Sequence, residues 1–357
     1  AKPGKKKKVL FVLEIVVLLL FIGGLYVYGQ ISSRLDKIQQ PELKRETIPV
    51  NPEAPKMTGY KTYVLFGIDT RGAGSNLSAQ NSDTMIIVSV NNDTGEVRMA
   101  SVYRDTLLDV GDGTYTKANA AYAYGGPEQA IAMLNTNLDL DISDYATADF
   151  SALVEVVDDL GGLDIPLSYA EIVHMNNYCQ ETSKLTGKSY TPVELPDPKP
   201  EDEEAIVDTY HLNGVQVTSY CRIRYTASMD MGRTERQRKV LGMIFDKAKI
   251  AGLTSIFKIM DDVFPMVQTS LSKQDILGLI PTVIGYDFSD STGFPAKYKF
   301  SKIKATGSII VPTDLASNVT ELHKFLYNDQ NYTPSSEVLE KSNKILEIVG
   351  GEGKLDE

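Results

Sequence analysis

The sequence predicts an α/β domain with a mixed central sheet flanked by helices, preceded by one N-terminal transmembrane helix. Three observations support this class. Strand-like and helix-like apolar patterns alternate along residues 60–330, as expected where helices cover a sheet. The loop 91–95, Asn-Asn-Asp-Thr-Gly, joins two strand patterns as a hairpin. An almost wholly apolar run fills residues 9–28, which is typical of a membrane span.

The apolar run is long enough to cross a membrane, because its twenty residues rise about 30 Å as a helix. Residues 1–8 hold five lysines and no acid, so the positive-inside rule makes them a cytoplasmic tail. A cleaved signal peptide is the alternative, but its apolar region would be shorter and would end at small residues, whereas Tyr26 and Tyr28 stand here. We therefore expect a single-pass protein of the cell membrane with an extracytoplasmic main domain.

The outer part of the chain divides by composition. Residues 29–59 contain four prolines among polar residues and are predicted to form an extracytoplasmic tether. The main domain is expected over residues 60–330, and a C-terminal helix and tail over 331–357. Residues 171–210 interrupt the regular pattern, and within them the stretch 194–204 holds six acids and three prolines. That stretch is predicted to be an exposed excursion.

Individual elements follow from apolar spacing and from residues that start or stop them. Gly126-Pro127 and Ser151 are suitable helix starts, and Gly161-Gly162 is a suitable helix end. Period-two and continuous β-type runs predict strands, and spacings of three and four predict helices. The strands are expected at 63–68, 84–90, 96–103, 163–167 and as a pair within 298–312, and the helices at about 126–138, 151–160, 233–250, 254–263, 272–285 and 335–348.

The charge balance excludes one class of partner. The formal net charge is −11, and after residue 8 there are 31 basic residues against 47 acidic ones. A nucleic-acid-binding domain is usually basic, so we expect no nucleic-acid partner. Any anion site must then be a local concentration of Arg and Lys.

The two cysteines, Cys179 and Cys221, are too few for a disulfide framework and wrongly spaced for a zinc site. Because an exported domain permits disulfides, we predict that they are bonded. The bond would tie the 171–210 excursion to the segment that holds Arg222. Two unrelated, partly buried thiols are the alternative.

Two acids follow or open neighbouring strands. Asp69 ends the first strand, just before Arg71, and Asp83 opens the second. Carboxylates at one end of adjacent strands suit a hard cation, since Mg²⁺ takes one or two carboxylates and leaves its other positions to water and phosphate. The alternative is that both acids only cap turns.

Arg104 and Asp105 follow the third strand. Because the second and third strands are hairpin partners, we expect Arg104 to emerge near Asp83. A surface ion pair between Arg104 and Asp105 is the alternative. Lys117 is a further cation, and the sequence gives weaker support for placing it in an anion site.

A second group of cations lies later in the chain. Arg222 and Arg224 alternate with Ile223, so on a strand both would point to one face, where an anion would relieve their repulsion. Asp230, Arg233 and Gln237 belong to the start of the long helix. Helix N-termini favour anions, and residues at i and i+4 share a face.

In combination these segments resemble the LytR-CpsA-Psr family of Gram-positive cell-wall enzymes. The resemblance covers about residues 60–250 together with the short tail and single anchor. It is carried by the motifs G-x-D-x-R, S-D-T-M, R-D-T, K-x-N-x-A-Y, R-x-R and D-x-G-R-x-x-R-Q in this order. It implies a three-layer domain and a metal-dependent phosphotransferase that moves a teichoic acid, capsule or similar polymer from a polyprenyl-pyrophosphate carrier to peptidoglycan.

The resemblance also implies roles for single residues. Asp69 and Asp83 would hold Mg²⁺ or Mn²⁺. Asp83, Arg104 and Asp105 would form the catalytic set, with Asp105 orienting arginines or assisting as base. The pyrophosphate site would be formed by Arg71, Arg104, Lys117, Arg222, Arg224, Asp230, Arg233 and Gln237, and Asp230 in this site would orient the arginines. One departure is Asn81, which stands where many relatives carry an arginine.

Other functions remain open from the sequence. If water is the acceptor, the protein is a polyprenyl-pyrophosphate hydrolase. If it has no catalytic activity, it is a membrane-tethered binder or regulator. A polyprenyl tail also demands an apolar groove. The helices after Arg233 and the region of Ile131, Met133 and Leu134 are candidate linings, and ordinary packing in the core is the alternative for each.

Overall fold

Strand β2 (Ser82–Asn91) shows how the sequence builds the centre of the molecule. Seven of its ten residues are buried, and the apolar ones alternate between two clusters. Met85 and Ile87 belong to one cluster, whereas Ile86 and Val88 belong to another. Because successive side chains on a strand point to opposite faces, this strand must be covered on both sides.

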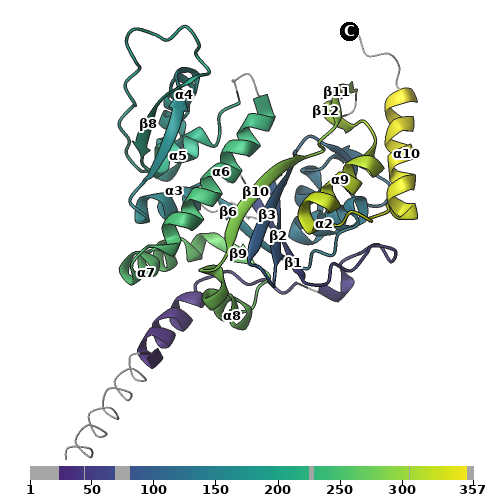
Figure 1. Cartoon of the computed structure of the whole chain (residues 1–357), viewed down its shortest axis with the longest axis horizontal. Helices are drawn as coiled ribbons and strands as arrows, with labels where there is room; N and C mark the ends of the chain where they lie inside the picture. Colours follow the sequence, from purple (N-terminus) through teal and green to yellow (C-terminus); the bar gives the residue numbers. More distant parts are fainter. Residues whose placement is uncertain (1–23, 44, 69–80, 225–228, 305, 352–357) are drawn as a thin grey trace, which may run out of the picture.

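The computed structural model describes residues 24–43, 45–68, 81–224, 229–304 and 306–351 (Figure 1). Its central sheet is mixed and has the strand order β10-β3-β2-β1-β6-β9. The pairs β1–β2, β2–β3 and β6–β9 are antiparallel, and the pairs β1–β6 and β10–β3 are parallel. The other strands of this sheet are β1 (Tyr60–Ile68), β3 (Glu96–Val102), β6 (Asp144–Asp149), β9 (Val267–Thr269) and β10 (Asp287–Phe294).

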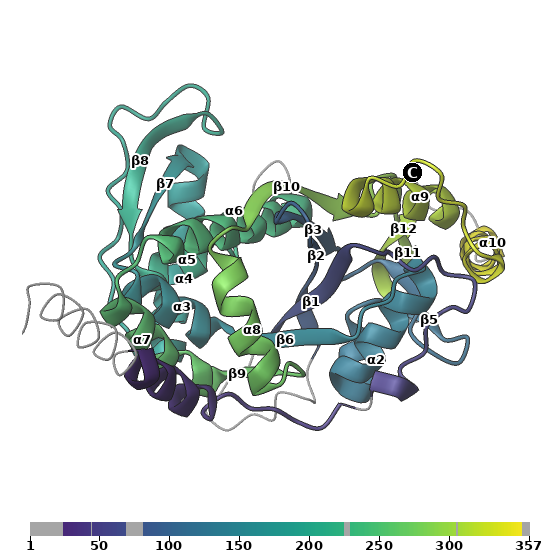
Figure 2. The same cartoon turned by 60° about the horizontal axis from the view of Figure 1, so that its bottom comes forward.

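Helices α2 (Ala120–Leu138) and α9 (Leu315–Tyr327) cover one face of the sheet, and α10 (Ser336–Gly351) packs on their outer side (Figure 2). Helix α2 is kinked at Gly125 and Gly126, so its straight part begins at the Gly-Pro pair that the sequence marks. Ile131, Met133 and Leu134 are fully buried in this layer. They are core residues, and that candidate lining of a groove was wrong.

The opposite face is covered by α6 (Met229–Lys249) and α8 (Lys273–Val283). Leu241 of α6 packs against the cluster formed by Ile86, Val88 and Met99. The helices predicted at 233–250 and 272–285 are therefore present, and α6 begins four residues earlier than expected. The architecture is a central mixed sheet between helical layers, as the sequence predicts.

A separate lobe stands beside the sheet (Figure 2). It consists of α3 (Phe150–Asp159), the antiparallel pair β7 (Leu163–Ser168) and β8 (Ile206–Leu212), α4 (Tyr169–Thr186) and α5 (Gly214–Tyr220). The expectation that 171–210 is irregular was wrong in its first half, because α4 fills residues 169–186. Ser168 and Glu171 form a capping box that starts this helix, and that pattern was readable in the sequence. The stretch 194–204 is exposed and contains neither helix nor strand, as predicted.

The remaining elements are short or peripheral. The strand pair predicted within 298–312 is present as β11 and β12. Helices predicted near 151–160, 254–263 and 335–348 are present as α3, α7 and α10. The bounds of the elements not yet given are η1 (Arg45–Thr47), β4 (Leu107–Asp109), β5 (Tyr115–Lys117), α7 (Leu253–Asp262), η3 (Phe264–Met266), β11 (Tyr298–Ile303) and β12 (Gly307–Pro312).

Residues predicted to form a tether pack on the domain at several points. Leu35 and Ile38 join an apolar cluster with Met260 of α7, and Gln39 exchanges backbone hydrogen bonds with β9. The amide of Asn51 donates to the carboxylate of Asp139 over 2.7 Å. This segment is therefore fastened to the domain rather than separated from it, whereas the outer domain boundaries stay predictions.

The disulfide prediction was wrong, because Cys179 and Cys221 are both free thiols. Cys179 lies on α4 and Cys221 directly follows α5, and both are buried in the apolar cluster of the lobe. Burial raises the pKa of Cys221 to about 12. Packing of α4 against α5 joins these segments without a covalent bond.

The predicted membrane span falls mainly outside the described residues, which begin at residue 24. Within the described part of the chain, no helix combines the length and the apolar character needed to cross a bilayer.

We expect the buried Asp139 to contribute strongly to stability. It ends α2 in a left-handed conformation (φ 52°), and its carboxylate accepts hydrogen bonds from Asn51, Tyr332 and Ser335 at 2.5–2.9 Å. Asp139→Asn keeps the shape but turns one acceptor into a donor. The free energy of unfolding in urea should fall by about 2 kcal/mol.

The exposed Asp141 provides the matched control, and Asp141→Asn should change that free energy by less than about 0.5 kcal/mol. Equal effects of the two substitutions would show that the Asp139 network is not a stabilising tie.

Candidate functional site

Asp83 lies in a β-bulge between β1 and β2. Gly67 pairs with Thr84 and Ile68 pairs with Ser82, so Asp83 is the extra residue of the bulge. A side chain at Gly67 would bring a Cβ to 2.8 Å from the Cβ of Thr84, so this close pairing requires glycine. Bulges re-aim side chains at sheet ends, and here the bulge turns the Asp83 carboxylate toward a cluster of arginines.

Arg104 follows β3, and its Nη1 lies 2.8 Å from Oδ1 of Asp83. The expected proximity of these two residues is therefore confirmed. The Nε of Arg104 lies 3.4 Å from Oδ2 of Asp105, whose Oδ1 lies 2.9 Å from Nζ of Lys117. These contacts form a chain of alternating charges at the end of the sheet, and each side chain is only partly exposed.

Beside Asp83 is a cavity of about 250 Å³. Arg224 reaches into it with Nη2 3.7 Å from Oδ2 of Asp83, and Nη2 of Arg233 lies 3.5 Å from the Asp83 carbonyl oxygen. Among the described side chains, three guanidinium groups and two carboxylates thus share a small volume, and such a concentration of guanidinium groups suits an anionic ligand. The lining residues are Asp83, Phe150, Tyr178, Glu181, Cys221, Arg222, Arg224, Arg233 and Gln237.

Arg222 and Arg224 do not lie on a strand, which corrects that prediction. Residues 221–224 form the turn that leaves α5. The expected alternation nevertheless holds, because Arg222 and Arg224 line the cavity while Ile223 is buried in the apolar cluster of the lobe. The turn produces the same separation of faces that a strand would have produced.

Side chains of α3 and α4 fix the position of Arg222. Its guanidinium lies 5.2 Å from the ring centre of Phe150 and 5.3 Å from that of Tyr178, within range of cation–π attraction. It donates to Oγ1 of Thr182 at 3.0 Å and to Oε2 of Glu181 at 2.9 Å. Its side chain is 9% exposed, so Arg222 is held in one orientation before any ligand arrives.

The sequence reasoning missed Phe150, Tyr178 and Glu181 as site residues. Tyr178 and Glu181 lie on α4, within the part of the chain that was expected to be irregular. The capping box at Ser168 predicts the helix. Nothing in the local sequence indicates that this helix faces Arg222, because the two are more than forty residues apart.

Helix α6 supplies Arg233 and Gln237, which both line the cavity as the i, i+4 spacing predicts. Gln237 donates to the carbonyl oxygen of Cys221 at 3.5 Å. The neighbouring Arg236 is also buried and pairs with Glu171 at 2.9 Å, so it stabilises the lobe and is not part of a solvated face.

Some predicted site residues are outside the described structure. Asp69 and Arg71 lie in the undescribed segment 69–80, and for Asp230 only the backbone, in the first turn of α6, is described. Their predicted roles are neither supported nor opposed by the geometry. Among the described residues, Lys117 joins the cluster through Asp105. Neither Lys117 nor Arg104 is among the residues that line the cavity.

A second cavity, of about 210 Å³, lies between the sheet and the layer of α6 and α8, and its lining is apolar. It is lined by Leu65, Val88 and Met99 from the sheet and by Leu241, Phe245, Leu279 and Val283 from the helices. Arg233, Gln237, Leu241 and Phe245 follow one another at spacings of four on α6. They share one helix face, and the face changes from charged to apolar over about 18 Å.

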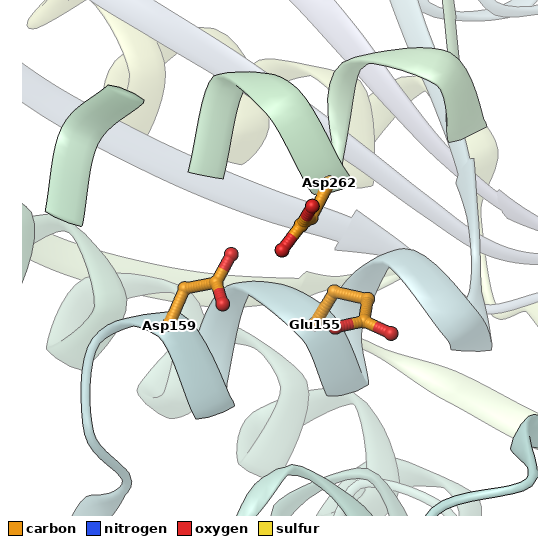
Figure 3. Close-up of side chains that lie close together, drawn as sticks. All are labelled: Glu155, Asp159 and Asp262. Atoms are coloured by element: carbon orange, nitrogen blue, oxygen red, sulfur yellow. The ribbon is translucent and has the colours of Figure 1, made fainter. Parts of the chain in front are cut away.

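A separate group of carboxylates lies between α3 and α7 (Figure 3). Oxygens of Glu155, Asp159 and Asp262 lie within 4.8 Å of one another. The ammonium of Lys258 contacts Asp159 and lies 2.9 Å from Asp262, and Lys188 lies 2.8 Å from Glu155. These ammonium groups supply the counter-charge that a metal ion would bring, so the group acts as an ion-pair tie between α3 and α7.

Comparison with known proteins gives consistent matches. The model of the LytR_cpsA_psr family matches residues 25–290. The polyisoprenyl-teichoic acid–peptidoglycan teichoic acid transferase TagU of Bacillus cereus is 28% identical over 283 residues, which cover 77% of this chain and 83% of that protein.

Solved structures resemble the fold over most of their length. A Streptococcus agalactiae protein superposes with a TM-score of 0.61 at 26% identity, covering 78% of this chain and 92% of the other. The family protein YwtF (TagT), solved with bound octaprenyl pyrophosphate lipid, superposes with a TM-score of 0.55 at 19% identity. It covers 83% of this chain and all of the other.

We expect Glu181 to compete with anions for Arg222. Glu181→Gln removes the carboxylate that lies 2.9 Å from the Arg222 guanidinium. Inorganic pyrophosphate should then bind roughly twofold to fivefold more tightly in isothermal titration calorimetry, since one exposed ion pair no longer has to be broken.

Glu203→Gln is the matched control, because Glu203 is equally exposed (47%) and pairs with Lys199 at 2.7 Å outside the cavity. The Glu203→Gln variant should bind pyrophosphate with the same affinity as the unaltered chain. Weaker binding by Glu181→Gln would instead mean that Glu181 holds Arg222 in its ligand-binding orientation.

Proposed function

The chain belongs to the LytR-CpsA-Psr family, and on this premise we propose that it is a phosphotransferase of cell-wall assembly. It moves a glycopolymer from a polyprenyl-pyrophosphate carrier to peptidoglycan. The observation that carries this proposal is the convergence of Arg222, Arg224 and Arg233 with Asp83 on one cavity. The name of the relative TagU supports the same transfer reaction.

In the proposed reaction an acceptor hydroxyl of peptidoglycan attacks the phosphorus that bears the glycopolymer. The bond between this phosphorus and the bridging oxygen breaks, and the carrier leaves as a lipid monophosphate. The hydroxyl proton passes to a base or to solvent. Negative charge moves to the leaving phosphate, so the preorganised guanidinium groups of Arg222, Arg224 and Arg233 stabilise the transition state more than the ground state.

Arg104, Asp105 and Asp83 have distinct parts in this reaction. Arg104 links the two carboxylates, at 2.8 Å from Asp83 and 3.4 Å from Asp105. Both oxygens of Asp105 are engaged, one by Arg104 and one by Lys117. Of the two roles open to Asp105, orienting the cations fits these contacts better than taking a proton.

The proposal includes a Mg²⁺ or Mn²⁺ ion held by Asp83 together with Asp69. A carboxylate at the edge of a phosphate site is the donor that such hard cations prefer, and Asp83 is partly exposed beside the cavity. When bound, the ion would add positive charge against the pyrophosphate oxygens.

The apolar cavity between the sheet and helices α6 and α8 suits the polyprenyl tail. It begins on the helix face that also carries Arg233 and Gln237, so a ligand with a charged head and an apolar tail matches the order of residues along α6. We propose that the protein works at the outer face of the cell membrane. The carrier, the wall acceptor and the predicted span over residues 9–28 all require this location.

Transfer to water in place of peptidoglycan would make the protein a hydrolase. The product analysis described below distinguishes a hydrolase from a transferase.

Loss of a single arginine that lines the cavity, such as Arg224, or that pairs with Asp83 beside it, such as Arg104, should slow the transfer. Arg224→Ala and Arg104→Ala each remove a charge-assisted interaction of about 1.5–3 kcal/mol. The kcat/KM for transfer from a lipid-linked glycopolymer should therefore fall roughly tenfold to a hundredfold. The assay should follow both the lipid monophosphate and the polymer-linked peptidoglycan by mass spectrometry.

Arg98→Ala is the control, since Arg98 is similarly buried but pairs with Glu96 away from the cavity. It should retain full kcat/KM. Full activity in Arg224→Ala and Arg104→Ala would refute the shared anion site, and release of free glycopolymer phosphate without linkage to peptidoglycan would make the protein a hydrolase.

Removal of the proposed metal ligand should act differently from removal of an arginine. Asp83→Ala should abolish the increase in turnover that Mg²⁺ or Mn²⁺ gives to the unaltered chain. Binding of the lipid pyrophosphate measured in EDTA should persist, because the arginines remain. Turnover of the unaltered chain that EDTA leaves unchanged would exclude the metal from the reaction.

A further inference from the structure

Two helices at one end of the molecule are apolar but incompletely buried. Helix α8 contains Ile276, Leu277, Leu279, Ile280 and Val283, yet none of its residues is fully buried. In α7 the only fully buried residue is Met260. Amphipathic helices of a globular domain normally bury such side chains, so this end of the molecule lacks part of its apolar surroundings.

Large apolar side chains are exposed at the junction of α6 and α7 and at the C-terminal end of α8. Ile250 is 84% exposed, Leu253 60%, Ile280 39% and Ile284 68%. Ile280 and Ile284 flank the cavity residue Val283. The C-terminal half of α6 reaches this cavity, because Phe245 lines it and the Phe245 ring lies 4.2 Å from that of Phe288 of β10, which also lines it.

The first described helix, residues 24–35, docks on the same two helices (Figures 1 and 2). Its Leu35 packs in one cluster with Ile256 of α7 and Ile276 of α8. An ion pair between Arg34 and Asp261 at 3.1 Å fastens it to α7. Helices α9 and α10 lie at the opposite end of the molecule in both views.

We propose that the surface formed by Ile250, Leu253, Ile280 and Ile284, here called the bilayer surface, rests on the phospholipid bilayer. The proposal rests on the proposed function, because that function requires a membrane-borne carrier. The apolar run of residues 9–28 leads directly into the docked helix. Leu35 follows Tyr28 by only seven positions, about 10 Å of helix, so a span over 9–28 holds α7 and α8 close to the lipid headgroups.

The residues before Leu35 also suit a lipid boundary. Leu25, Tyr26 and Tyr28 are 55–65% exposed, and tyrosine is enriched where membrane spans meet water. A soluble partner protein would not explain why the exposed apolar residues continue from the domain onto the helix that leads to the predicted span. Apolar side chains at a membrane surface insert about 5–10 Å into the headgroup boundary.

This placement has a consequence for the carrier. Val283 lines the apolar cavity and directly precedes Ile284 of the bilayer surface, so a polyprenyl tail would pass from the lipid into the protein close to this surface. The pyrophosphate then lies further along α6, beside Gln237 and Arg233 at the other end of the shared helix face. The reacting phosphates are thereby lifted away from the membrane, toward the wall acceptor.

Depth-dependent fluorescence quenching tests the placement directly. The full chain is reconstituted in phosphatidylglycerol vesicles with one new cysteine, Ile250→Cys or Ile284→Cys, carrying an environment-sensitive dye. Cys179 and Cys221 are buried and should not react. Lipids with a nitroxide near the headgroup should reduce the emission at least roughly twofold at both positions. Labels at Leu339→Cys and Leu346→Cys, on exposed positions of α10, should not be quenched.

A transfer assay is the second test of the bilayer surface. Ile250→Glu combined with Ile284→Glu should lower the rate with a carrier embedded in vesicles by roughly tenfold. The rate with a short-chain, water-soluble pyrophosphate analogue should not change. Leu339→Glu with Leu346→Glu is the control and should change neither rate.

The outcomes separate this inference from the proposed function. Unquenched labels at 250 and 284, or an equal loss of rate with both substrates, would overturn the bilayer surface while leaving the transferase proposal intact. Quenched labels without any transfer by the unaltered chain would overturn the proposed function and leave the bilayer surface standing.

Discussion

Repulsion among crowded guanidinium groups is the constraint on which the site depends. Arg222, Arg224 and Arg233 share one small cavity, and like charges this close are tolerated only when counter-charges hold them apart. Asp83 and Glu181 supply those charges from opposite sides, one from a strand bulge and one from α4. In the proposed function, a pyrophosphate replaces these carboxylates as the counter-charge of the guanidinium groups.

Helix α6 joins the two chemically different halves of the proposed ligand. One of its faces begins with Arg233 and Gln237 and continues with Leu241 and Phe245. The same helix covers the central sheet, so the position of the charged end relative to the apolar end is set by a rigid element rather than by a loop. Rigid elements hold a site more accurately than loops do, and this suits an enzyme that must position two phosphates on a long flexible lipid.

The lobe and the N-terminal segment contribute to the position of the site. The lobe presents α4 to Arg222 and is tied through α3 to α7 by the Lys258 ion pairs. Helix α7 in turn holds residues 24–35, which lead toward the predicted membrane span. A continuous series of packed helices therefore connects the proposed anchor to the arginine cavity, and the two are held at a defined separation.

The sequence by itself determined the class of fold, the three-stranded start of the sheet and the identity of most cavity residues. Alternating apolar residues specify strands locally, and the hairpin loop 91–95 brings Arg104 to Asp83 because pairing register follows from a short turn. Tertiary structure alone decided that Glu181, Tyr178 and Phe150 surround Arg222, that the two thiols stay separate, and that α7 and α8 remain partly uncovered. The physical reason is that these contacts join segments distant in the chain, and their partners are selected by packing of whole helices rather than by any local pattern.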